Sequence, residues 1–262
     1  MRARIRDEWT RLRAAAQRVD VQTATVLTLA GFLVVLQFTL GSRTFFVRDL
    51  AGALSPEWRG LASWGWWFGM QGVLGFVVPV MVLRWGFRQS WTSMGLALGD
   101  WKLASTLAGV YLVGVAIGTW VLSDGSGFQA QYPHYKAATR DWSLFLMYEA
   151  LFLFYWIGWE YLWRGFVLFG TRHSLGLAAI FVQALPFAAL HVDKPWPEAM
   201  LSVVGGIALG ALVWRCRSFW IAVPIHAAQM LLLDFWCTLR ARSGASGIGV
   251  DALLDALAAI ST

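Results

Sequence analysis

The sequence predicts an all-α, polytopic transmembrane helical bundle of about seven spans, within a range of six to eight. Of its 262 residues, 58% are hydrophobic and only 14% are charged, a balance typical of membrane proteins rather than soluble domains. Seven apolar stretches approach the ~20 residues that a helix needs to cross a bilayer. Seventeen Trp residues suit the aromatic belts at the two bilayer surfaces.

The predicted spans follow one another along the chain, at 23–41, 61–83, 103–122, 143–170, 175–191, 199–214 and 219–238. The first three form an N-terminal group, 23–122, that contains almost no ionisable side chains within its apolar runs. A Gly- and Ser-rich stretch, 123–141, joins this group to the second half of the chain. We expect a four-helix core at 143–240 and a C-terminal tail at 241–262.

The N-terminal segment 1–22 is basic and resembles the start of a signal peptide, because it contains Arg2, Arg4, Arg6, Arg11, Arg13 and Arg18. The apolar run that follows is too long for a signal peptide, and no small-x-small cleavage site follows it. We therefore expect an uncleaved first span, preceded by an amphipathic segment on the membrane surface. The distribution of Lys and Arg among the loops predicts a cytoplasmic N-terminus. From the general look of the sequence, we expect the membrane to be a bacterial cytoplasmic (inner) membrane.

Four ionisable side chains fall within or at the edge of the apolar runs of the core: Glu160, Arg164, His191 and His226. Such groups are costly at membrane depth and usually mark functional sites. Glu160 and Arg164 are four residues apart and share one face of a helix. The plain alternatives are a buried ion pair that only fixes helix packing and histidines that are hydrogen-bonded core residues. An acid and two imidazoles on successive spans favour a catalytic site.

This set of side chains admits two chemistries. In the first, Glu and His activate a water molecule while the second His donates a hydrogen bond to an oxyanion, and no cofactor is needed. In the second, Glu160, His191 and His226 bind zinc, which acidifies a bound water. The sequence does not separate the two, although the absence of an HExxH helix disfavours zinc.

Two further residues belong to a secondary or substrate site. Phe187 lies one helical turn before His191 and is expected to cover one side of the imidazole. Glu198 follows Pro197 at the head of a span, and we interpret it as a helix cap or a partner of His191. Small residues at 205, 206 and 210 predict close helix packing.

Three motifs then occur in order: WEYLWR (159–164), FAALH (187–191) and HAAQM (226–230). They resemble EExxxR, FxxxH and HxxxN, the motifs of the CAAX-protease and bacteriocin-processing (Abi) family of intramembrane proteases. The resemblance covers roughly residues 143–238. It implies an intramembrane endopeptidase whose partners are the lipid bilayer and a membrane protein or peptide substrate, with no role for nucleic acid.

The resemblance also implies a role for each candidate residue. Glu160 acts as the base, Arg164 holds it, His191 shares the water and His226 stabilises the tetrahedral intermediate. Glu160 and His191 meet at one depth only if the helix that carries Glu160 continues through about Gly170.

Two positions depart from the family motifs. Trp159 stands where the family has its first glutamate, and Met230 stands where it has an asparagine, for which the neighbouring Gln229 is a candidate substitute. These departures favour the alternative of a catalytically inactive relative that binds or shields a membrane partner, as an immunity or chaperone-like protein does. A proton-coupled transporter is disfavoured because the chain shows no internal repeat.

Overall fold

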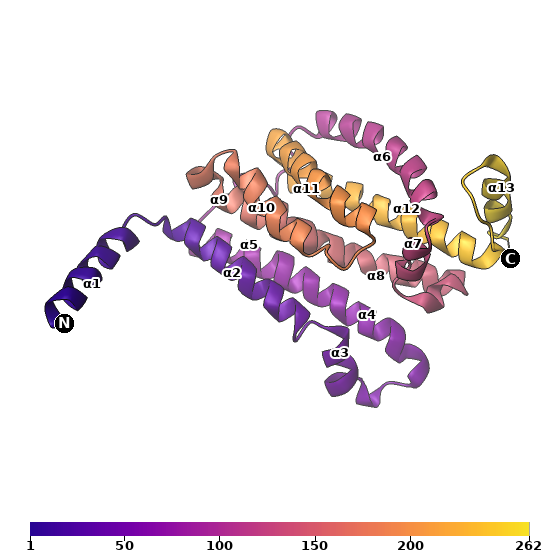
Figure 1. Ribbon diagram of the computed structural model, residues 1–262, viewed down its shortest axis with the longest axis horizontal. Helices are drawn as coiled ribbons and strands as arrows, with labels where there is room; N and C mark the ends of the chain where they lie inside the picture. Colours follow the sequence, from indigo (N-terminus) through magenta and orange to yellow (C-terminus); the bar gives the residue numbers. More distant parts are fainter. Residues whose placement is uncertain (262) are drawn as a thin grey trace.

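The computed structural model describes residues 1–261, and all the regular secondary structure in that range is helical (Figure 1). Within it, six helical stretches are long and apolar enough to cross a bilayer: Val21–Phe38, Pro56–Gly86, Trp101–Ser123, Trp142–Leu175, Trp196–Cys216 and Phe219–Ser243. The prediction of an all-α polytopic bundle is therefore confirmed, with a number of spans inside the expected range.

The fifth predicted span, 175–191, is a shorter helix in the structure. Its apolar part forms α10 (Ala178–Ala189), which has 12 residues. At ~1.5 Å of rise per residue, a helix of that length does not cross a hydrocarbon core of ~30 Å. One face of α10 packs inside the protein, where the helix contacts α9 (Leu168–Leu175), η6 (Tyr161–Val167) and α11 (Trp196–Cys216). Phe181 and Leu185, which are four residues apart on another face, are exposed.

The N-terminal half begins with α1, which extends away from the bundle (Figure 1). Its elements are α1 (Arg2–Ala16), α2 (Val21–Phe38), α3 (Arg43–Phe45), η1 (Phe46–Leu50), η2 (Ala51–Ala53), α4 (Pro56–Gly72), η3 (Val73–Val77), α5 (Val78–Met81), η4 (Val82–Gly86) and α6 (Trp101–Ser123). Because α4, η3, α5 and η4 follow one another without a break, they form one long helical stretch.

The C-terminal half contains the elements that hold the candidate residues. Its elements are α7 (Ser126–Gln131), η5 (Lys136–Thr139), α8 (Trp142–Glu160), η6 (Tyr161–Val167), α9 (Leu168–Leu175), α10 (Ala178–Ala189), α11 (Trp196–Cys216), η7 (Phe219–Ile221), α12 (Ala222–Ser243) and α13 (Val250–Ala258). The helix that carries Glu160 continues without a break through α8, η6 and α9, so the expected extension past Gly170 is confirmed.

Glycines allow the backbones of α4, η3 and α8 to touch. A Cβ atom on Gly158 would overlap the backbone carbonyl of Gln71, and a Cβ atom on Gly75 would overlap the carbonyl of Gly158. Small residues are the usual means of bringing two membrane helices this close. The contact fixes the position of the last turn of α8, which is the turn that ends at Glu160.

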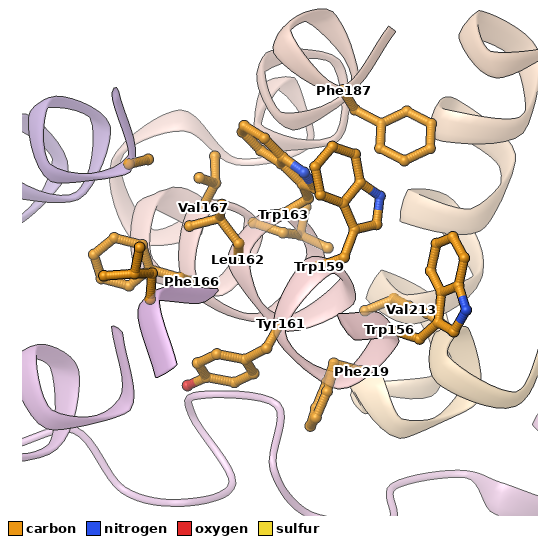
Figure 2. Packing of buried hydrophobic residues seen from close by; sticks show 14 of the residues in the cluster. Trp156, Trp159, Tyr161, Leu162, Trp163, Phe166, Val167, Phe187, Val213 and Phe219 are labelled. Atoms are coloured by element: carbon orange, nitrogen blue, oxygen red, sulfur yellow. The ribbon is translucent and has the colours of Figure 1, made fainter. Parts of the chain in front are cut away.

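A cluster of aromatic side chains surrounds η6, the π-helical turn that follows Glu160 (Figure 2). Tyr161, Trp163 and Phe166 are fully buried and point in different directions from this turn. Packed on several sides by large rings, η6 has little freedom to rotate. Segments of π-helix inside longer helices are common at functional sites, because the extra residue per turn changes where side chains point.

The backbone contact at Gly158 yields a stability prediction. We expect Gly158→Ala to lower the free energy of unfolding by about 1–3 kcal/mol, since the new methyl group must push α4 away from α8. Gly69→Ala is the matched control, because a Cβ atom at Gly69 has nothing within 4 Å. Thermal unfolding in detergent micelles measures both variants, and equal midpoints would contradict the proposed backbone contact.

Candidate active site

Glu160, Arg164 and His226 form one buried constellation. Oε1 of Glu160 accepts a hydrogen bond from Nη1 of Arg164 at 3.1 Å and another from Nδ1 of His226 at 2.7 Å. Glu160 and Arg164 are completely buried, and His226 is 8% exposed. The pairing of Glu160 with Arg164, expected from their spacing of one helical turn, is present. The contact with His226 links the end of α8 to the first turn of α12.

The hydrogen-bond partners of the two candidate histidines fix their tautomers. A carboxylate only accepts hydrogen bonds, so Nδ1 of His226 carries the proton that it donates to Glu160. Nδ1 of His191 lies 2.7 Å from the backbone carbonyl of Phe187, which also only accepts. In both rings Nε2 is therefore the nitrogen left for a substrate or water, and in the neutral ring it accepts a proton.

Phe187 lies at the centre of the site. The guanidinium carbon of Arg164 is 4.0 Å from the centre of the Phe187 ring. The rings of His191 and His226 lie 4.6 and 6.0 Å from it, centre to centre. The expectation that Phe187 covers one side of the His191 imidazole is thus confirmed, and the same ring also contacts Arg164 and His226.

Close packing of α10 against α11 holds Phe187 in place. A Cβ atom on Gly206 would lie 3.0 Å from the Phe187 ring, and the side-chain amide of Gln183 donates a hydrogen bond to the Gly206 carbonyl at 2.9 Å. A Cβ atom on Gly210 would press against the same Gln183 amide. The close helix packing predicted at 206 and 210 is confirmed, whereas Gly205 faces a cavity.

That cavity has a volume of about 480 Å³ and lies between α6, α11 and α12, with α10 at one end. Its wall is mainly apolar, with polar groups contributed by Arg164, His191, Glu198, Ser202, His226 and Gln229. Concave, mostly apolar spaces with a few convergent polar groups are typical of binding and active sites. The cavity therefore brings both candidate histidines to one space, which is large enough for several side chains of a substrate.

Glu160 does not line this cavity. Its carboxylate lies behind His226, with Oε1 bound to two partners, and Oε2 has no hydrogen-bond partner among the described residues. Arg164, unlike Glu160, borders the cavity. Its Nε and Nη2 have no hydrogen-bond partner among the described residues. In the described chain, Glu198 is the one acidic residue of the cavity wall.

Glu198 is held by a residue that the sequence did not single out. Both of its carboxylate oxygens lie within reach of the Tyr132 hydroxyl, at 2.6 and 2.7 Å. Burial raises the pKa of Tyr132 well above its ordinary value, so the hydroxyl keeps its proton and is the donor. In the part of the chain that the structure describes, no N-cap side chain bonds the start of α11. Glu198 is an acidic residue in the first turn of α11, the position in which a carboxylate favours a helix N-terminus.

The two positions that depart from the family motifs both lie in the site. Trp159 is buried, and Figure 2 shows its indole beside Trp163 and Phe187. Its ring centre is 6.2 Å from that of His191, so an indole stands next to this imidazole where the motif would place a carboxylate. Met230 borders the cavity, as does Gln229, whose side-chain oxygen accepts a hydrogen bond from Tyr111 at 2.7 Å.

The zinc alternative requires a cluster of ligands. Within residues 1–261, no group of three or more His, Cys, Asp or Glu side chains is arranged to hold a metal ion. Glu160 and His226 are in contact, and Nδ1 of His191 is bound to a backbone carbonyl. Nε2 of His191 is the nitrogen that would be left for a metal, as it is for water.

Comparison with known proteins agrees with the sequence motifs. Residues 141–232 match a family model described as type II CAAX prenyl endopeptidase Rce1-like. This segment runs from the start of α8 into α12 and contains Glu160, Arg164, His191 and His226. No curated protein and no solved structure matches the chain. The resemblance to the CAAX-protease family is thereby confirmed for the segment that carries the site.

The buried ion pair yields a second prediction. We expect Glu160→Leu to destabilise the protein by about 3–5 kcal/mol, because it leaves the Arg164 guanidinium buried without a counter-charge. The double variant Glu160→Leu/Arg164→Met should regain most of this loss. Thermal unfolding in detergent measures both, and a double variant no more stable than the single one would contradict the role of the unpaired charge.

Proposed function

We propose that this protein is an intramembrane endopeptidase that hydrolyses a peptide bond of a membrane-associated protein or peptide. One observation carries the proposal: two imidazoles, each with Nδ1 engaged and Nε2 free, border the same cavity among helices long enough to span a bilayer. The match of residues 141–232 to the Rce1-like endopeptidases supports it.

His191 is the general base in this mechanism. Its Nδ1–H is bound to a backbone carbonyl, so Nε2 of the neutral ring takes a proton from water. The water oxygen attacks the carbonyl carbon of the substrate, forming a tetrahedral oxyanion. Protonated His191 then gives the proton to the leaving amine, and the C–N bond breaks.

The oxyanion is stabilised by two other residues of the cavity wall. Protonated His226 donates from Nε2, and the unpartnered N–H groups of Arg164 add positive charge. Glu160 orients His226 through Nδ1 and balances its charge, much as a buried carboxylate orients histidine in serine hydrolases. We thus assign Glu160 to positioning, rather than to the water-activating role expected from its motif.

The walls of the cavity suggest the class of substrate, and the charges of the loops suggest the orientation in the membrane. Its walls are mainly apolar, which suits a substrate segment that is itself anchored in lipid. The Lys and Arg distribution between the spans supports a cytoplasmic N-terminus. We assign the protein to a bacterial cytoplasmic membrane, with no cofactor in the reaction.

A second function, binding without hydrolysis, is favoured by one observation. The Trp159 indole fills the space beside His191, and the Glu160 carboxylate is sealed from the cavity. A catalytically inactive relative of this kind would hold an apolar segment in the cavity and release it uncleaved.

Proteoliposomes test the proposal with a peptide library in which a leucine-rich helix of ~20 residues precedes a randomised polar sequence. We expect mass spectrometry to detect cleavage by the wild-type protein. His191→Ala and His226→Ala should each reduce it by about a hundredfold or more, because each removes a group that transfers a proton or stabilises charge.

His173→Ala is the matched control, since His173 is exposed, is paired with Asp20 and lies outside the cavity. It should cleave at the wild-type rate. Cleavage that survives both site substitutions would contradict the proposal, whereas a wild-type protein that binds the peptides and leaves them intact would favour the inactive relative.

A further inference from the structure

Glu198 occupies a distinctive place in the cavity. It lies in the first turn of α11, immediately after the short turn that follows His191. Both residues border the same cavity, and His226 is close enough to interact electrostatically with the Glu198 carboxylate. A carboxylate is costly at membrane depth, and Glu198, which is partly exposed, borders a cavity and forms no ion pair within 4 Å among the described residues, so its presence calls for a chemical explanation.

The contacts of Glu198 leave part of its carboxylate available. The Tyr132 hydroxyl has one hydrogen, so it donates to one carboxylate oxygen at a time, and a carboxylate has about four acceptor positions. Lys194 acts on Glu198 through its charge, but its ammonium group is 3.0 Å from Nε2 of His134. Glu198 is therefore oriented by Tyr132 while it retains acceptor capacity toward the cavity.

Neither Glu160 nor position 159 offers a second carboxylate to the cavity. Glu160 is bound by Arg164 and His226 and does not border the cavity. The Trp159 ring of α8 lies 6.2 Å from the His191 ring, centre to centre, and it offers no acceptor. Among the described residues of the cavity wall, a water molecule beside His191 thus has one carboxylate to which it can donate.

We propose that Glu198 is a catalytic residue that binds and orients the hydrolytic water for His191. This inference rests on the proposed endopeptidase function. One O–H of the water donates to the Glu198 carboxylate, and the other gives its proton to Nε2 of His191 as the oxygen attacks the peptide carbonyl. His191 passes that proton to the leaving amine, and the products are a carboxylic acid and an amine.

The test uses the library peptide that the wild-type protein cleaves best. We expect Glu198→Gln to lower kcat by about a hundredfold or more, since it replaces an anionic acceptor with a neutral amide of the same shape. KM should change less than about twofold, because a residue that binds the water makes little contact with the bound peptide. Glu57→Gln is the matched control: Glu57 also follows a proline in the first turn of a helix but is exposed.

Three outcomes overturn the inference. Wild-type kcat in Glu198→Gln, with cleavage abolished by His191→Ala and His226→Ala, would remove Glu198 and leave the proposed function intact. A rise in KM at unchanged kcat would assign Glu198 to binding a cationic group of the substrate. A wild-type protein that cleaves nothing would remove both proposals together.

A second variant distinguishes a catalytic role of Glu198 from a purely structural one. Thermal unfolding is measured for each protein, and if Glu198→Gln does not fold, Glu198→Asp carries the test. The shorter side chain keeps the charge but moves the carboxylate by about 1 Å, which should lower kcat by about ten- to a hundredfold at unchanged KM. A folded Glu198→Asp protein with wild-type kcat would overturn the inference.

Discussion

A completely buried carboxylate organises the centre of this protein. Glu160 is completely buried, where an isolated charge is strongly unfavourable. Arg164 and His226 offset the cost of burying this charge, because both donate a hydrogen bond to the same carboxylate oxygen. Arg164 comes from the same helical stretch, whereas His226 lies near the start of α12. The carboxylate therefore joins α8 and η6 to α12, and it determines which nitrogen of His226 is left for chemistry. His191 is held by a different contact, the hydrogen bond from its Nδ1 to the backbone carbonyl of Phe187 in α10.

Packing of the helices around these two bonds sets the distance between the imidazoles. Gly158 brings α8 against α4, and Gly206 brings α11 against the Phe187 ring. Phe187 in turn contacts Arg164, His191 and His226, so one ring spaces the charged groups and excludes water from the ion pair. Both histidines border the cavity, whose other lining residues come mainly from α6, α11 and α12.

Local geometry made part of this site predictable. Glu160 with Arg164, and Phe187 with His191, are one helical turn apart, and a turn of helix fixes which side chains meet. The contacts of Glu160 with His226 and of Tyr132 with Glu198 each join residues 66 positions apart, so they depend on how helices pack. Hydropathy alone likewise does not distinguish a long crossing helix from the shorter apolar helix α10, so the segment 175–191 was predicted as a span although α10 has 12 residues. Which glutamate faces the cavity also depends on how the helices pack, so the sequence did not reveal it.

Nitrogen NMR of the histidine side chains in lipid tests the central claim most directly, because the shifts of Nδ1 and Nε2 report which atom carries the proton. At a pH where the rings are neutral, the account predicts that His191 and His226 both carry it on Nδ1. Glu160→Gln should change the signals of His226 and leave those of His191 as they were. A neutral His226 ring that carries its proton on Nε2 instead of Nδ1, or signals of His226 that do not respond to Glu160→Gln, would contradict the account.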